Sequence, residues 1–411
     1  MAAVRRRIGL GMVFACLAST LILGLVVKAP CASGDWSDGR QNTHFCYSDI
    51  EPLLSTEQLA GGRLPFLDPC SSAPGECDEY PVLTMYTMRV AAWASSAAGN
   101  DIAGFFYANV ALLTIAAFVV ALLLYLLVGS RVLYFVLAPT LLVYGFINWD
   151  LVAVALAIAG TFAYLRRRDV WSGVFLGLGA AAKLYPALLV VPFVAGRLHE
   201  RKPDAGIHLA WASIGTWLAV NAPFAIASPQ GWWEFFRFNS TRSADWDSLW
   251  FLGCHRVTGN LYCLHTRAIN VASVLIFGGL TLALWRWKRR REPNFARWTL
   301  AFPILIVFLL SNKVYSPQYG LWLLPWFALT LPNLPLFLAF SAADVAVFLT
   351  RFSWFARYAG GSGGLPIGAF EIAVAVRAIV LVVCVIAWVR RRVPVAGADP
   401  PIEPVAAEVA A

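Results

Sequence analysis

The apolar positions of this chain fall in long runs that short polar segments separate. Runs of this length are too long for buried strands and predict helices. There are about twelve of them, several shorter than the ~20 residues that a full membrane span requires. The runs are Ile8–Lys28, Ala103–Val128, Val132–Ile147, Leu151–Tyr164, Val170–Ala182, Tyr185–Ala195, Ile207–Ala227, Ala268–Trp285, Trp298–Leu310, Gly320–Leu331, Pro335–Thr350 and Ile367–Val389. The pattern predicts an all-α polytopic membrane protein with about 12 transmembrane or half-spanning helices.

One long stretch has basic residues at both ends and a break in its middle, at Lys183-Leu184-Tyr185-Pro186. Two half-spanning helices that meet at the break would place both ends on the same side. Broken backbone at membrane depth is tolerated where protein or a cavity surrounds it.

Composition agrees with a membrane location. The chain is 59% hydrophobic and 13% charged, with a mean hydropathy of +0.67. A soluble domain is about 45–50% apolar and about 25% charged. The net charge of +9 comes largely from clusters next to apolar runs, as in cytoplasmic loops, so we expect no nucleic-acid partner. These clusters are Arg5–Arg7, Arg166–Arg168, Arg197–Lys202, Lys288–Arg291 and Arg390–Arg392.

The first apolar run is compatible with a cleaved signal peptide or a retained anchor. It is longer than the usual signal core, which favours the anchor. Both interpretations export the loop that follows. The count of spans leaves both termini in the cytoplasm. We therefore expect one membrane domain over residues 1–392 and a disordered cytoplasmic tail, rich in Pro and Ala, over residues 393–411.

The predicted exported surface consists mainly of a large first loop, about residues 33–98, and a second loop over residues 229–267. The short turn at Asn148-Trp149-Asp150 and the turns after Ser311 and Arg351 complete it. Within the first loop, Val82–Ala98 mixes apolar and polar residues, as an amphipathic helix in the membrane interface does.

Six cysteines fall in the exported loops, which suggests disulfides formed in an oxidising compartment. Cys70 with Cys77 and Cys254 with Cys263 are the natural short-range pairs, although connectivity cannot be read from sequence. A zinc site is the alternative, but no paired CxxC or nearby histidines accompany the cysteines. We expect no metal. The six are Cys31, Cys46, Cys70, Cys77, Cys254 and Cys263.

Three acidic positions in these loops could take part in chemistry. Asp49 lies soon after the first helix, where a shielded carboxylate would serve as a general base toward a hydroxyl. A solvated surface acid is its plainer interpretation. Glu79-Tyr80-Pro81 ends the same loop and is either part of a site or a simple turn. Asp150 either belongs to the site or caps the next helix.

Lys183 and Lys313 both lie in apolar surroundings. An ionisable group at membrane depth usually marks a functional site, although a lysine can also extend its amine to the interface. Both lysines would suit a departing phosphate. Arg242 lies among aromatic residues of the second loop, a mixture typical of carbohydrate and lipid-phosphate sites and of an interfacial aromatic belt. Since no nucleotide-binding motif is present, an activated donor would have to be a lipid or reach the outer face by another route.

Taken in order, several short motifs resemble glycosyltransferase family 87, the polyprenyl-phosphate-dependent, mannosyltransferase-like membrane enzymes of actinobacteria. The similarity extends over nearly the whole chain up to Arg392. The motifs are Ser48-Asp49, Glu79-Tyr80-Pro81, Asn148-Trp149-Asp150, the Gly-rich run into Lys183-Leu184-Tyr185-Pro186, and Asn312-Lys313 through Gln318-Tyr319.

The resemblance implies a GT-C architecture, an outward-facing active site beneath the first loop, a polyprenyl-phosphate sugar donor and no cofactor. It also implies that Asp49 is the catalytic acid of the first loop. Lys183, Lys313 and Arg242 would hold the donor phosphate, and Gln318, Tyr319, Glu79, Tyr80 and Asp150 would line the substrate site.

The resulting hypothesis is an inverting glycosyltransferase of the plasma membrane, with mannose as the expected sugar and a glycolipid or lipoglycan as acceptor. A lipid or sugar flippase would share the broken helices and buried lysines. However, no paired inverted repeat is evident, and transport does not require a large disulfide-linked loop. A non-catalytic scaffold is the third possibility, and transfer of label from a polyprenyl-phosphate sugar distinguishes the three.

Overall fold

The computed structural model describes residues 8–32, 38–70, 77–96, 99, 101–360 and 363–391. Helices and turns account for all the regular structure in these ranges, which confirms the all-α prediction. Within these ranges, six helices are long and apolar enough to span a membrane. They are α1 (Leu10–Lys28), α5 (Ile102–Val128), α11 (Pro203–Ala227), α14 (Thr266–Arg291), α17 (Leu334–Tyr358) and α18 (Ile367–Arg390).

Shorter apolar helices lie between these spans, and two of them meet at the predicted break. The shorter helices are α8 (Asp150–Leu165), α9 (Asp169–Ala182), α10 (Pro186–His199) and α15 (Ala301–Ser311), the last preceded by η4 (Arg297–Leu300). Lys183 has extended backbone angles directly after α9, and Pro186 begins α10. Proline is well tolerated at a helix start, so the interruption matches the sequence.

Three predicted segments differ in the structure. The run Val132–Ile147 is not one helix, because Pro139 holds Ala138 extended and separates two short helices. The run Gly320–Leu331 is a 3₁₀ turn followed by a short helix. The predicted turn after Arg351 lies beyond Tyr358 instead, since Arg351 is buried inside α17 in ion pairs. The short elements are η3 (Gly129–Val132), α6 (Leu133–Val136), α7 (Pro139–Tyr144), η5 (Pro317–Trp322) and α16 (Leu324–Thr330).

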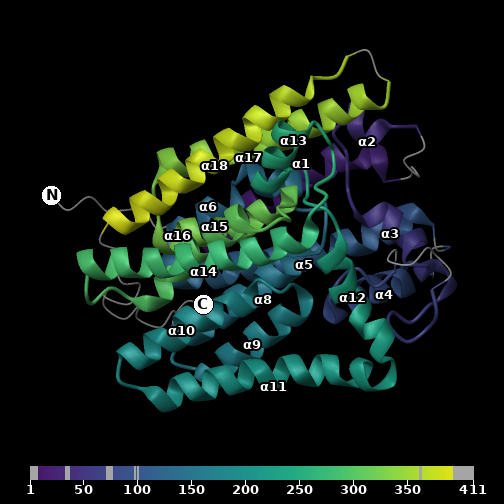
Figure 1. Cartoon of the computed structure of the whole chain (residues 1–411). Coiled ribbons are helices and arrows are strands. Elements are labelled where there is room, and N and C mark those ends of the chain that lie inside the picture. Colours follow the sequence, from purple (N-terminus) through teal and green to yellow (C-terminus); the bar gives the residue numbers. More distant parts are fainter. Residues whose placement is uncertain are drawn as a thin grey trace.

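The predicted exported loops contain helices of their own, and α2, α3, α4 and α12 gather at one end of the molecule, on the right of Figure 1. The connection between α10 and α11 and the basic C-terminal ends of α14 and α18 lie at the opposite end. The loop elements are η1 (Ala29–Cys31), α2 (Arg40–Thr43), α3 (Ile50–Thr56), η2 (Leu59–Gly61), α4 (Val82–Ser96), α12 (Pro229–Thr241) and α13 (Leu249–Thr258).

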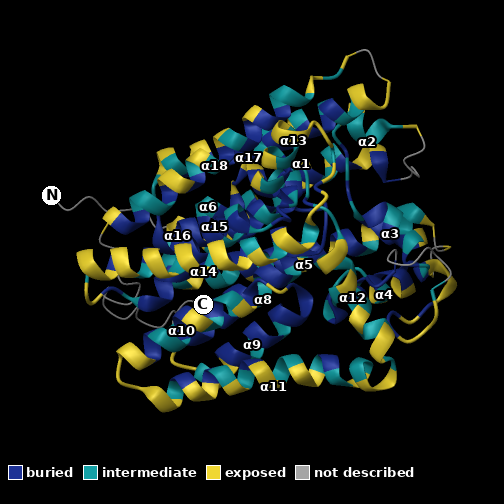
Figure 2. Cartoon of the chain, viewed as in Figure 1, coloured by how far each residue is buried: buried dark blue, intermediate teal, exposed yellow. Residues whose placement is uncertain are grey.

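Burial follows this arrangement. Figure 2 shows exposed residues along the outward faces of α11 and α14, as expected for helices that face lipid. In the predicted interfacial segment, α4 buries Met85 and Met88 and exposes Val90 and Trp93. The proposed single domain stays a prediction, and the tail over residues 393–411 lies outside the described residues.

Among the described residues, three disulfides lie within the predicted exported loops. They include both short-range pairs, Cys70–Cys77 and Cys254–Cys263, and add Cys31–Cys46. The last pair attaches the segment just before Asp49 to the end of α1. Cys16 and Cys384, both inside helices, are free.

Helices α9 and α11 pack closely through small residues. A Cβ atom at Gly173 would meet the Leu209 carbonyl and the Ala212 side chain, and one at Gly177 would meet the Ser213 carbonyl. This small-xxx-small spacing allows two backbones to approach each other within the membrane.

We therefore expect Gly173→Ala to destabilise the protein by about 1–3 kcal/mol, because the added methyl separates α9 from α11. The matched control is Gly215→Ala on α11, where a Cβ atom meets nothing within 4 Å. Thermal unfolding in detergent should show a lower midpoint for Gly173→Ala alone. Equal midpoints for the two variants would contradict this packing.

Candidate active site

The site is built where three interruptions of helical backbone meet. One interruption precedes α8, one separates α9 from α10, and one follows α15. The Asp150 carboxylate joins them, since it accepts hydrogen bonds from the Lys183 amine at 3.1 Å and from the Trp322 indole N–H at 2.7 Å. Asp150 and Lys183 are both buried, and the ion pair lets each carry its charge there.

Asp49 lies beside this junction and is anchored through its backbone and its side chain. Its N–H donates to the Ile147 carbonyl at 2.8 Å. The Tyr47 hydroxyl donates to one carboxylate oxygen at 2.5 Å. The Asn148 amide at 2.7 Å and the Gln318 amide at 3.3 Å donate to the other. Three neutral donors, which come from parts of the chain far from one another, thus fix the carboxylate. The residue stays partly exposed.

This environment acts on the pKa of Asp49 in both directions. Burial raises the pKa above its ordinary value, and the hydrogen bonds from Tyr47 and Asn148 lower it in part. The positive charges of Lys183 and Arg351 also favour the ionised form. Asp49 is therefore a fixed carboxylate with raised basicity, as a general base requires.

Asn148 connects Asp49 to the other end of the first loop. Its amide nitrogen also donates to the Tyr80 hydroxyl at 2.7 Å, and its amide oxygen accepts from the Trp149 N–H. The Lys183 amine lies over the rings of Tyr80 and Tyr319, at 5.4 Å and 5.1 Å from their centroids. Asn148 thus connects Asp49 to Tyr80, and the Lys183 amine lies over the Tyr80 and Tyr319 rings close enough for its charge to act on Asp49.

Glu79 and Arg242 complete the group. The Glu79 carboxylate forms no hydrogen bond or ion pair with the described residues. Burial and the neighbouring Asp49 charge raise its pKa to about 7, while Arg242 and Lys183 act to lower it. The Arg242 guanidinium forms neither a hydrogen bond nor an ion pair with the described residues, and lies 5.3 Å from the Phe238 ring centroid. Both side chains are partly exposed and free to meet a ligand.

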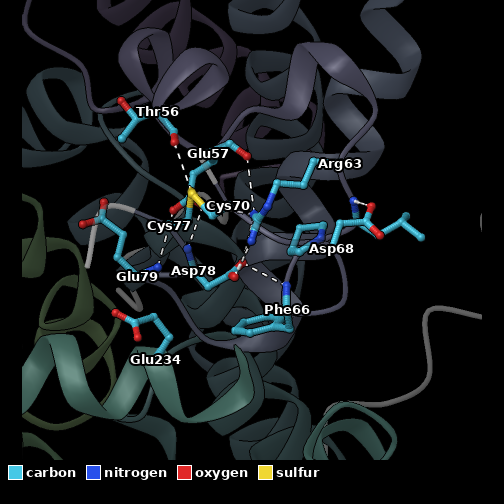
Figure 3. A network of polar contacts seen from close by, with 12 residues as sticks. Thr56, Glu57, Arg63, Phe66, Asp68, Cys70, Cys77, Asp78, Glu79 and Glu234 are labelled. Atoms are coloured by element: carbon cyan, nitrogen blue, oxygen red, sulfur yellow. Dashed lines mark hydrogen bonds and ion pairs between the residues drawn. A yellow bond between two sulfur atoms is a disulfide. The ribbon is translucent and has the colours of Figure 1, made fainter. Parts of the chain in front are cut away.

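A buried network in the first loop holds the Glu79 segment in place (Figure 3). The Glu57 carboxylate accepts hydrogen bonds from the backbone N–H groups of Asp78, at 2.8 Å, and Glu79, at 3.4 Å. The Arg63 guanidinium binds both carboxylate oxygens of Asp78, at 3.2 and 2.5 Å. Figure 3 shows the Glu79 side chain turned away from this network.

Lys313 is placed differently from Lys183. Its amine donates to the carbonyls of Ser240, at 3.1 Å, and Arg242, at 2.8 Å. The residue is 4% exposed. Burial, and to a lesser degree the charge of Arg242, lower the pKa of Lys313 to about 8. The predicted site residues therefore gather around Asp49, with Lys313 behind the backbone that carries Arg242.

The structure also brings in charges that the sequence interpretation missed. Arg351 on α17 pairs with Asp247 at 2.8 Å and with Asp245 at 3.5 Å. Arg377 on α18 pairs with Asp344 at 3.2 Å and donates to the Asp247 carbonyl at 2.9 Å. The signal was present, because Asp344 and Arg377 lie within apolar runs where an ionisable group is costly.

The model of glycosyltransferase family 87 matches residues 79–311, more than half of the chain. The chain belongs to this family. It is a membrane glycosyltransferase. The matched range includes Glu79, Asp150, Lys183 and Arg242, whereas Asp49 precedes it and the segment from Lys313 to Tyr319 follows it.

Two solved structures are similar to this family 87 chain. The crystal structure of ArnT from Cupriavidus metallidurans bound to undecaprenyl phosphate is 15% identical, with a TM-score of 0.46 over 93% of this chain and 77% of that one. ArnT in the apo state is 16% identical, with the same TM-score over 92% and 76%. No curated protein sequence matches.

We expect Arg63→Met to destabilise the first loop by about 3–5 kcal/mol, because it leaves Asp78 buried without its cation. Arg237→Met is the matched control, since the Arg237–Glu234 pair is far more exposed and such pairs contribute about 0–1 kcal/mol. Thermal unfolding and limited proteolysis of the loop measure the difference. The same stability in both variants would show that the Arg63 network does not hold the loop.

Proposed function

We propose that this family 87 glycosyltransferase transfers a sugar, with mannose as the first choice, from a polyprenyl phosphate to a hydroxyl group of a glycolipid or lipoglycan. The observation that carries the proposal is the arrangement around Asp49. A carboxylate fixed by three neutral donors lies in one group with the cations Lys183 and Arg242. A base and cations for a leaving phosphate are what displacement at a glycosyl phosphate requires.

In this mechanism Asp49 is the general base. The acceptor oxygen forms a bond to the anomeric carbon while its proton passes to the Asp49 carboxylate. The bond between the anomeric carbon and the phosphate oxygen breaks, and the polyprenyl phosphate leaves with the electron pair. Attack from the face opposite the phosphate inverts the anomeric centre, so no second nucleophilic carboxylate is needed.

Lys183 and Arg242 would stabilise the charge that develops on the phosphate. Arg242 suits this role because its guanidinium is unpaired among the described residues and presents several donors to phosphate oxygens. Lys183 keeps its charge through Asp150 and borders Tyr80 and Tyr319. Lys313, the other lysine that the sequence suggests for the phosphate, is buried against backbone carbonyls, so we assign the contact to the first two.

The remaining side chains would bind the sugar. Glu79 can accept hydrogen bonds from sugar hydroxyls. Gln318 donates a hydrogen bond to Asp49 and so lies beside the same site. The rings of Tyr80 and Tyr319 can pack against the face of a sugar. Both rings lie close to the Lys183 amine, which supports a site that holds sugar and phosphate together.

We place the site on the outer face of the plasma membrane. The loop helices α2, α3, α4 and α12 lie at one end of the molecule, and the basic clusters at the ends of α14 and α18 lie at the other (Figure 1). The disulfides fall in the predicted exported loops. Basic residues favour the cytoplasmic side, and disulfides form in oxidising compartments. Both termini would then be cytoplasmic.

Asp49→Asn should abolish transfer of labelled mannose from polyprenyl-phosphate mannose to acceptor, with a loss of at least about 10²-fold, because the amide cannot take up the proton. The purified protein should keep its yield and unfolding temperature. Asp68→Asn, the same change at an exposed position of the same loop, is the control and should retain activity. Full transfer by Asp49→Asn would remove Asp49 as the base.

The pH dependence of kcat/KM gives a second test. Asp49 must be ionised to accept a proton, so activity should rise as pH rises through its pKa. Tyr47→Phe removes a hydrogen bond that favours the ionised form. The rising limb of the pH profile of Tyr47→Phe should therefore move to higher pH. Its plateau should be close to that of the unaltered protein. An unchanged limb, or a shift to lower pH, would contradict the role of Asp49.

A further inference from the structure

The segment that ends α12 and the segment that follows α15 are joined by a clasp of polar contacts. The Lys313 amine donates to the carbonyls of Ser240 and Arg242. In return, the Asp245 N–H donates to the Lys313 carbonyl at 2.8 Å. The Ser316 hydroxyl donates to the Asp245 carboxylate at 3.0 Å. We refer to these four contacts as the 240–316 clasp.

Buried ion pairs support the 240–316 clasp. Asp245 also lies 3.5 Å from Arg351, which is bonded to Asp247. Nearby, the Trp250 indole N–H donates to the Ser311 carbonyl at 2.8 Å. The two segments are therefore fixed to each other and to α17, although about 70 positions separate them in the chain.

Lys313 supplies a hydrogen-bond donor at the C-terminal end of α12. The last carbonyls of a helix have no partner within the helix, and they carry the negative end of its dipole. Helix α12 ends at Thr241, so the Ser240 and Arg242 carbonyls lie at that end. A buried amine between them satisfies both and fixes the direction in which the chain leaves the helix.

Arg242 is the first residue after that end, and its guanidinium is unpaired among the described residues. Apart from the Phe238 ring beneath it, the guanidinium has no partner among the described residues, so its position depends mainly on the backbone that carries it. The Lys313 amine donates a hydrogen bond directly to that backbone, at the Arg242 carbonyl.

We propose that Lys313 is a positioning residue, which holds the end of α12 so that Arg242 points at the donor phosphate and which does not touch the phosphate itself. The inference rests on the proposed function, in which Arg242 binds that phosphate. It predicts that the contribution of Lys313 to turnover passes through Arg242 and disappears when Arg242 is removed.

A double-mutant cycle tests this, with kcat measured at saturating polyprenyl-phosphate mannose. Arg242→Met should lower kcat by about 10²-fold and Lys313→Met by about 10-fold. The double variant should be no slower than Arg242→Met alone. Lys313→Arg, which keeps donors for the carbonyls, should recover most of the loss. Lys183→Met is the matched control, and its loss should multiply with that of Lys313→Met.

The outcomes separate the two proposals. Losses that multiply in the Arg242→Met/Lys313→Met variant would overturn the positioning role, because Lys313 would then act on the substrate by itself. Normal turnover in Lys313→Met would also overturn it, while the role of Arg242 would stand. Normal turnover in Arg242→Met would instead remove Arg242 from the proposed function.

If Lys313→Met does not fold, Ser316→Ala replaces it in the cycle, because it removes a different contact of the 240–316 clasp. It should lower kcat by a few-fold, again with no further loss in the Arg242→Met background. Unfolding temperatures of all variants show whether a loss of turnover comes from the site or from the fold. A multiplicative loss here would count against the clasp in the same way.

Discussion

The structure depends on one buried interaction, the Asp150 carboxylate shared by Lys183 and Trp322. Backbone that is not helical is costly at membrane depth, because its polar groups find no water there. This protein interrupts its helices at three places and brings the interruptions together, where each shields the others. A charge removed from that junction would leave its partner buried and alone.

The site follows from this junction. Asn148, two positions before Asp150, holds Asp49 and Tyr80, so the two ends of the first loop close over the interruptions. Lys183 is buried in the junction, with its amine over two aromatic rings. The same interruptions that expose polar backbone thus supply a carboxylate, a cation and aromatic faces at one place in the membrane domain. Arg242 comes from a different loop, which buried contacts of Asp247 with Arg351 and Arg377 hold against α17 and α18.

Much of this was accessible from sequence because the signals were local. Apolar length predicted the spans, and Pro186 after Lys183 predicted the break between α9 and α10. Other features depend on tertiary placement. Only the fold brings together Cys31 and Cys46, Arg351 and its acidic partners, and Lys313 and the carbonyls to which it donates. Lys183 and Lys313 have similar sequence surroundings, yet Lys183 pairs with a carboxylate and Lys313 with backbone carbonyls.

The most direct test of the account is a structure of the protein with a polyprenyl phosphate bound in a lipid environment. We expect phosphate density within hydrogen-bond distance of the Arg242 guanidinium and close to the Lys183 amine. The space between that phosphate and the Asp49 carboxylate should be large enough for a sugar ring. Phosphate bound elsewhere, with Asp49 and Arg242 far from it, would show that these residues do not form one site for glycosyl transfer.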